Sequence, residues 1–211
     1  MDELANGMSG KIIEVNDNDL TLCGTSDEVF IYTIKNELRE DLIPGMLVET
    51  KFKNDFKIEQ TFPQTINGEV EDIIVLNEGN DYINLYIDII DSIYKEEYTT
   101  NPINMISLDL KEEFNLTENE RVSLAYLLEK KYNVPIHLFD YRELLNNGYI
   151  ENNSFKDGLL IEITSTLNKN DYFDFTISKW NEGLSTYYYR DCIALKEDNI
   201  WRYEIGYKMI S

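Results

Sequence analysis

The feature that most constrains the fold of this chain is a change in hydrophobic period near residue 80. Up to Leu76, apolar residues come in short runs with strand-like alternation, whereas from Ile83 they recur at helical spacing. A period of two is typical of β-strands, and a spacing of three to four residues is typical of an amphipathic helix. The polar segment Asn77–Asn80 separates the two patterns. The sequence therefore predicts two domains, residues 1–76 and 80–211.

The first domain is predicted to be a small β-barrel. Turn-forming residues such as Asn16–Asp19 and Pro44-Gly45 separate most of its short candidate strands. So many strands in about 70 residues, with a short helix near Lys35–Leu42, favour a closed or nearly closed barrel of the oligonucleotide/oligosaccharide-binding (OB) type. The candidate strands are Lys11–Val15, Leu20–Cys23, Val29–Thr33, Leu47–Phe52, Phe56–Phe62 and Glu69–Leu76.

The second domain is predicted to combine helices with an antiparallel sheet. The apolar residues from Ile83 onward predict an amphipathic helix with its polar face at Asn84, Asp88 and Asp91. Met105–Leu110 is a candidate strand. Capping signatures at Thr117–Glu120 and Asp140–Glu143 predict the starts of two further helices. Asn147-Gly148 predicts the end of the second one. The four candidate strands that follow are Leu159–Ser165, Tyr172–Trp180, Thr186–Leu195 and Trp201–Ile210. This order indicates an α+β fold in which the helices cover one face of a curved sheet.

The acidity of the chain limits its partners. The 40 acidic and 19 basic residues give a formal charge of −21, and both predicted domains are acidic, with 16 and 6 such residues in 1–76 and 24 and 13 in 77–211. A surface of this sign repels nucleic-acid phosphates, so we predict no direct nucleic-acid binding. We interpret the acidity first as a means of maintaining solubility. A basic protein partner is the alternative.

The sequence predicts no catalytic residue, no metal site and no cofactor. The chain has a single histidine, His137, and lacks the spacings of zinc, P-loop, dinucleotide and serine-hydrolase motifs. Cys23 and Cys192 are expected to be buried free thiols, with a single disulfide between them as the alternative. No apolar run is long enough for a transmembrane helix.

Aromatic residues near the C-terminus form the most unusual local pattern. Alternation places Tyr187 and Tyr189 on one face of a strand and Tyr188 on the other. We expect one face to belong to the core and simple cross-strand packing to account for the run. The alternative is that the other face exposes aromatic side chains beside Lys179 and Arg190, as in a protein or carbohydrate contact surface. The candidate contact residues are Trp180, Tyr187, Tyr188, Tyr189, Arg190 and Trp201.

The chain resembles a family of uncharacterised Firmicutes lipoproteins over most of residues 10–211. The residues that carry the resemblance are Gly10–Val15, Thr61–Ile66, Phe155–Gly158, Lys179-Trp180, Gly183-Leu184, Asp191-Cys192, Trp201 and Ile210-Ser211. Asp109, Asp157 and Asp191 also match positions in that family, and we interpret each as a turn or cap carboxylate. The resemblance implies an extracytoplasmic, lipid-anchored protein if a signal segment precedes Met1. A cytoplasmic protein is the other interpretation.

These observations favour a non-enzymatic binding or interaction protein, located at the cell envelope. The first alternative is an acidic cytoplasmic inhibitor or nucleic-acid mimic that acts on a basic protein. The second alternative is a hydrolase, which requires a pocket with converging carboxylates or a Ser/His pair.

Overall fold

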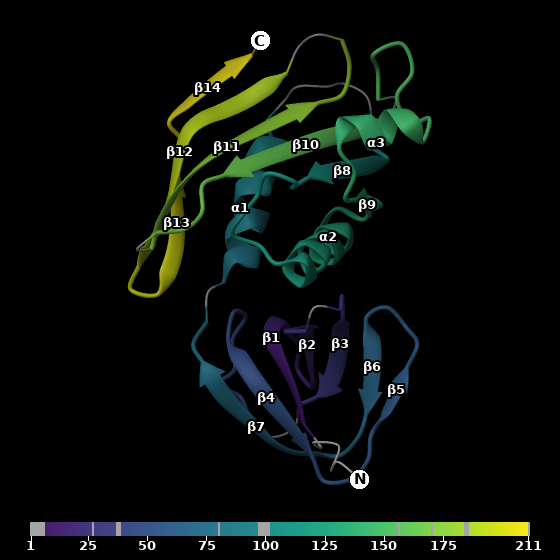
Figure 1. Cartoon of the computed structure of the whole chain (residues 1–211), viewed down its shortest axis with the longest axis vertical. Helices are drawn as coiled ribbons and strands as arrows, with labels where there is room; N and C mark the ends of the chain where they lie inside the picture. Colours follow the sequence, from purple (N-terminus) through teal and green to yellow (C-terminus); the bar gives the residue numbers. More distant parts are fainter. Residues whose placement is uncertain are drawn as a thin grey trace. The chain divides into compact units, whose positions relative to one another are not determined.

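The computed structural model describes residues 7–26, 28–36, 39–79, 81–96, 102–155, 157–169, 171–183 and 186–210. Within these residues the chain forms three helices and fourteen strands, so the fold is mixed α+β (Figure 1). The chain divides into two compact units. Unit 1 holds residues 1–83 and 118–123, and unit 2 holds residues 84–117 and 124–211. The domain limits of 1–76 and 80–211 stay predictions.

Unit 1 contains a seven-stranded sheet in the order β5-β6-β3-β2-β1-β4-β7. Among the described strands the sheet is open, because β5 and β7 stand at its two ends, and no closed barrel is found. Alternate residues of the central strands, such as Leu20 and Leu22 of β2, are fully buried and build the core with Tyr32, Val48 and Phe52. The strands are β1 (Gly7–Val15), β2 (Asp19–Gly24), β3 (Ile31–Lys35), β4 (Leu47–Phe52), β5 (Lys57–Glu59), β6 (Gln64–Asn67) and β7 (Val70–Asn77).

The helix predicted over Lys35–Leu42 was wrong for the residues that the structure describes. Residues 37–38 lie outside the described part, and residues 36 and 39–42 form no helix. The Asn36 side chain accepts from the backbone N–H of Arg39 at 3.2 Å and donates to its carbonyl at 2.8 Å. Such side-chain bonds to nearby backbone groups compete with helical hydrogen bonding.

Unit 2 contains a second seven-stranded sheet, ordered β13-β12-β11-β10-β8-β9, with β14 also paired to β12. The β10–β11 and β11–β12 pairs are antiparallel, as predicted, whereas β8 runs parallel to β10 and β9. Its strands are β8 (Met105–Asp109), β9 (Ile136–His137), β10 (Gly158–Ser165), β11 (Tyr172–Trp180), β12 (Tyr187–Glu197), β13 (Ile200–Glu204) and β14 (Tyr207–Ile210). The helices are α1 (Tyr82–Tyr94), α2 (Glu118–Tyr132) and α3 (Tyr141–Asn146). The capping box that was predicted for Asp140 and Glu143 is present at α3.

The two faces of this sheet have different environments. On one face, which we call the covered face, Phe173 stacks on Tyr86 of α1 with ring centroids 6.2 Å apart, and α1 in turn contacts α2 through Tyr94 and Tyr132. On the other, the open face, Leu160 and Trp180 pack with Leu144 of α3 at one end of the strands. The prediction that all helices cover one face was therefore wrong, because α3 caps one end of the open face (Figure 1).

The strand predicted over Trp201–Ile210 is two strands, β13 and β14, which pair with different halves of β12. The break coincides with Gly206, where an added Cβ would lie 2.3 Å from the carbonyl oxygen of Asp191. Only glycine fits such a close backbone approach.

The polar face predicted for α1 needs one correction. Asp88 is exposed, but Asp91 is only 9% exposed. Its carboxylate accepts from the Tyr132 hydroxyl at 2.7 Å and pairs with Lys131 of α2 at 2.9 Å. Helix–helix packing, which sequence period does not reveal, therefore buries this residue. None of the described helices has the length and apolar character that a membrane crossing requires.

Candidate functional site

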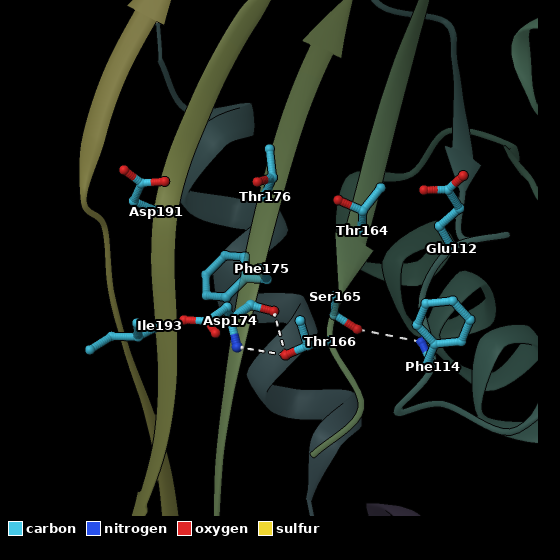
Figure 2. A pocket seen from close by; sticks show the side chains of 10 residues that line it. All are labelled: Glu112, Phe114, Thr164, Ser165, Thr166, Asp174, Phe175, Thr176, Asp191 and Ile193. Atoms are coloured by element: carbon cyan, nitrogen blue, oxygen red, sulfur yellow. Dashed lines mark hydrogen bonds between the residues drawn. The ribbon is translucent and has the colours of Figure 1, made fainter. Parts of the chain in front are cut away.

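A cavity of about 490 Å³ lies on the open face of the unit 2 sheet, at the end away from α3. Its floor is formed by strands β10, β11 and β12, and the β8–α2 loop forms one side (Figure 2). We call it the acidic cavity. It is lined by Glu112, Phe114, Thr164, Ser165, Thr166, Asp174, Phe175, Thr176, Asp191 and Ile193.

Strand register explains why the floor is polar. Thr164 of β10 is paired with Thr176 of β11, and Asp174 of β11 is paired with Ile193 of β12. Directly paired residues point to the same face of a sheet, and their neighbours along the strand point to the opposite face. Ile163 and Ile177 accordingly lie on the covered face and are fully buried. The threonine pair lies between the two sides of the cavity (Figure 2).

A bulge in β12 forms the side of the acidic cavity opposite the β8–α2 loop. The β11–β12 register shifts between Phe175 and Ile177, so Arg190 and Asp191 together oppose Thr176. Asp191 has a φ of +53°, and both residues are exposed. Bulges are common beside binding sites because they redirect a side chain. Here the bulge brings the Asp191 carboxylate to the lining of the cavity.

The β8–α2 loop is held by a buried carboxylate. Glu113 is fully buried and accepts from the Tyr86 hydroxyl at 2.5 Å, the Ser165 hydroxyl at 2.7 Å, and the backbone N–H groups of Asn115 and Leu116 at 2.8 and 2.7 Å. Burial and the adjacent carboxylate hold the pKa of Tyr86 well above its usual range. These bonds fix a loop that presents the 61% exposed Phe114 and the exposed Glu112 to the cavity.

The hydroxyl of Ser165 is used by the same network. It donates to Glu113 and accepts from the Phe114 backbone N–H at 3.4 Å and the Asn115 side-chain amide at 2.9 Å. A serine hydroxyl has one donor and two acceptor positions. Because these contacts occupy all three, Ser165 serves the loop structure and is poorly suited to act as a nucleophile.

The charged side chains that line the acidic cavity are all negative among the described residues. The described residues that line the acidic cavity include three carboxylates, Glu112, Asp174 and Asp191, and no Lys, Arg or His. Further along the open face, Glu162 of β10 is paired with Asp109 of β8. Burial, followed by the charges of Asp109 and Glu112, raises the pKa of Glu162. A cation bound here would relieve this mutual repulsion.

The predicted contact residues do not form one surface. Tyr187 and Tyr189 lie on the covered face, where the Tyr189 hydroxyl contacts the Ser92 carbonyl at 3.1 Å and the Glu96 carboxylate at 2.8 Å. Tyr188 and Arg190 lie on the open face, with the guanidinium carbon 4.8 Å from the centre of the ring. The predicted alternation of the three tyrosines is therefore confirmed.

The two tryptophans occupy different places. Trp180 is 8% exposed and belongs to the cluster beneath α3, although it also lines a second cavity on the open face. Trp201 of β13 lies beside Phe173, with ring centroids 5.5 Å apart. Only part of the predicted contact set thus reaches the open face beside the acidic cavity.

The alternative that placed Lys179 beside exposed aromatics was wrong. Lys179 is 2% exposed and donates to the backbone carbonyls of Ile93, in the last turn of α1, and of Glu96, just after that helix, at 2.7 and 2.5 Å. Burial lowers the pKa of this lysine to about 8. A cation at the carboxyl end of a helix satisfies carbonyls that lack an intrahelical partner.

Other residues singled out from the sequence have structural environments. Cys23 and Cys192 are free and buried in different units, as expected, and burial raises the pKa of the Cys23 thiol to about 11. His137 stacks on Phe139 with ring centroids 5.1 Å apart. Asp109 accepts from the backbone N–H of Lys111 at 3.2 Å, as a turn carboxylate does. Among the described residues there is no group of three or more potential metal ligands.

Comparisons with protein-family models, with curated proteins and with solved structures find no match for this chain. Its candidate site therefore rests on the geometry of the open face.

Sequence reasoning missed most of the acidic cavity. Glu112, Phe114 and Asp174 carry no motif, and the relevant pattern was the alternation of polar residues, Asp174 with Thr176 in one predicted strand and Thr164 with Thr166 at the end of another. That pattern indicates which face of each strand is polar. Only the register between the strands shows that the polar residues of the two segments lie side by side.

Proposed function

We propose that this protein is a non-enzymatic binding protein whose acidic cavity holds a positively charged segment of a partner protein. One observation carries the proposal: three carboxylates surround a floor of threonine hydroxyls without a basic side chain among the described lining residues. Carboxylates accept charge-assisted hydrogen bonds from Lys and Arg, which are stronger than neutral ones. The formal charge of −21 adds long-range attraction for a basic partner.

The resemblance to Firmicutes lipoproteins supports an envelope location for this binding protein. The same charge pattern also supports the alternative of a cytoplasmic inhibitor that mimics a nucleic-acid backbone, because both roles need a basic partner. For unit 1 we propose an OB-like arrangement. This is supported by the three-strand meander β1-β2-β3, by the pairing of β1 with β4, and by the parallel pairing of β3 with β6.

Neutralising the acidic cavity tests the proposed function. The triple variant Glu112→Gln, Asp174→Asn, Asp191→Asn removes the three carboxylates with little change in shape, and asparagine tolerates the positive φ at position 191. We expect its affinity for a short lysine- and arginine-containing peptide to fall about tenfold, since each exposed pair contributes roughly 0.2–1 kcal/mol. The measurement is isothermal titration calorimetry at about 50 mM salt, a low ionic strength at which surface charges are weakly screened.

A matched variant separates the site from overall charge. Asp17→Asn, Asp55→Asn, Glu71→Gln removes the same charge from exposed positions of unit 1. It should bind the peptide nearly as tightly as the unmodified protein. Equal weakening in the two triple variants would show that only net charge attracts the peptide, and the proposed site would be abandoned.

A further inference from the structure

A second cavity, of about 330 Å³, lies on the same open face as the acidic cavity. We call it the aromatic cavity. Its floor includes Glu162 of β10 and Ser178 of β11, and Tyr141 of α3 stands at its side with its ring 5.3 Å from that of Trp180. The lining is Tyr141, Asn153, Leu160, Glu162, Ser178, Trp180, Gly183, Thr186 and Tyr188.

The floors of the two cavities are consecutive rows of one sheet face. Glu162 is paired with Ser178 in the aromatic cavity, and Thr164 is paired with Thr176 in the acidic cavity. Same-face residues on a strand alternate, so no row of side chains stands between these two pairs. The two cavities therefore adjoin each other along β10 and β11, and we refer to the pair as the groove.

Hydrogen bonds hold the far end of this groove. Asn153 has a φ of +57° and donates from its side chain to the carbonyl of Gly183 at 2.6 Å. The same carbonyl accepts from the Trp180 indole N–H at 3.1 Å, and the Tyr141 hydroxyl contacts the Asn153 side-chain oxygen at 3.2 Å. The aromatic wall is thus preorganised, which reduces the entropy lost when a ligand binds.

The charges of the groove select its ligand. Glu162 lies on the floor of the aromatic cavity, with Asp109 as its neighbour on β8, and the acidic cavity adds Glu112, Asp174 and Asp191. The nearby Lys111 side chain pairs with Asp140 and Glu143, and Arg190 of β12 rests on the Tyr188 ring. A carboxylate among aromatic rings suits a guanidinium, which pairs with the carboxylate and stacks on the rings.

The distance between the two cavities along the strands determines how far apart the two basic side chains of a peptide ligand should be. Along β10 and the residue that follows it, the aromatic cavity involves Leu160 and Glu162 and the acidic cavity involves residues 164–166, an offset of about four residues between the two midpoints. At roughly 3.3 Å per residue, four residues of extended chain span about 13 Å. An extended peptide along the groove places residues i and i+4 on the same side, whereas i and i+3 point to opposite sides.

We propose that this groove binds an extended segment of a basic partner protein that carries two basic side chains four residues apart, with arginine in the aromatic cavity. The proposal rests on the proposed function and adds a second subsite and a spacing to it. A neutral oligosaccharide would fit the aromatic wall, but it would leave the carboxylates of the groove without a charged partner.

The test uses ten-residue serine/threonine peptides that carry two arginines at spacings of i+3 and i+4, titrated calorimetrically into the full-length chain. We expect the i+4 peptide to bind about tenfold more tightly. In Glu162→Gln this preference should disappear, whereas Glu204→Gln, which changes an exposed carboxylate of β13 outside both cavities, should retain it.

The possible results distinguish a failure of the two-subsite groove from a failure of the proposed function. Equal binding of both peptides, with weakening only in the Glu112/Asp174/Asp191 triple variant, would overturn the two-subsite groove and leave the proposed function in place. Equal peptide affinity of that triple variant and its unit 1 control would overturn both the two-subsite groove and the proposed function. Salt-insensitive binding of cellotetraose that displaces the peptide would overturn the choice of a basic peptide as ligand.

Discussion

At the scale of single residues, Glu113 and Glu112 show how neighbouring identical side chains serve different purposes. Glu112 is exposed and lines the acidic cavity, whereas Glu113 is buried and receives hydrogen bonds from two hydroxyls and two backbone N–H groups. The sequence offers no means of telling them apart, because both follow a predicted strand in a polar stretch. Only the approach of Tyr86 and Ser165 from distant segments defines the buried one.

Replacing Glu113 by glutamine should destabilise unit 2. The amide –NH₂ cannot accept a hydrogen bond, so at least one buried donor around it loses its partner. We expect the free energy of unfolding to fall by about 2–4 kcal/mol, the range for a broken buried network around a charge. Glu112→Gln, one residue earlier, should change it by no more than about 0.5 kcal/mol, as at other exposed positions. Urea denaturation of both variants checks this, and equal effects would contradict the assigned network.

At the same scale, the bulge residue Asp191 illustrates the limit of motif reasoning. It was interpreted as a turn or cap carboxylate, and its left-handed backbone agrees with an irregular position. Its place at the cavity depends on Gly206, fifteen residues later in the chain, which allows close approach to the Asp191 carbonyl. A long-range backbone contact of this kind leaves no local pattern.

At the scale of elements, periodicity and turn residues predicted most strands, and periodicity together with capping signatures predicted the three helices in the described part of the chain. The bounds of β4 and β11 agree with the predicted Leu47–Phe52 and Tyr172–Trp180, because turn residues flank both runs. Periodicity failed where tertiary contacts overrode it. The split of the last strand at Gly206 and the burial of Asp91 between α1 and α2 are the clearest cases.

The contact between α1 and α2 predicts a specific acid sensitivity. Burial alone would raise the pKa of Asp91, but hydrogen bonds from Lys95, Lys131 and Tyr132 outweigh it and lower the pKa to about 2. A carboxyl with a depressed folded-state pKa stabilises the fold above its unfolded value of about 3.9, and this contribution disappears as pH falls towards the folded value. The stabilisation by Asp91 should therefore fade between about pH 4 and pH 2.

Asp91→Asn tests this assignment. At pH 7 the variant should lose roughly 1–3 kcal/mol of unfolding free energy, as expected for charged hydrogen bonds that are removed from a partly buried site. The difference in unfolding free energy between the variant and the unmodified protein should become smaller as pH approaches 2. Asp88→Asn, an exposed change one turn earlier on α1, is the control and should show little difference at either pH. A constant gap from pH 7 to pH 2 would refute the ionised network.

At the scale of the whole molecule, composition shows a strongly acidic protein and is compatible with a basic partner, but it does not indicate the location of a binding site. The acidity is spread along the chain, so charge alone singles out no surface. The open face of unit 2 differs from the rest because two cavities, five carboxylates and an aromatic wall meet on it. Strand register creates that combination, because it brings together side chains from segments that are far apart in the sequence.

The most direct test of the central claim is a map of backbone amide chemical shifts during titration of the full-length protein with the i+4 two-arginine peptide. The account predicts saturable shifts on β10, β11, the bulge of β12 and the β8–α2 loop, and these shifts should need about tenfold more peptide in the Glu112/Asp174/Asp191 triple variant. Saturable shifts confined to unit 1, or small shifts spread over all acidic surfaces, would contradict it.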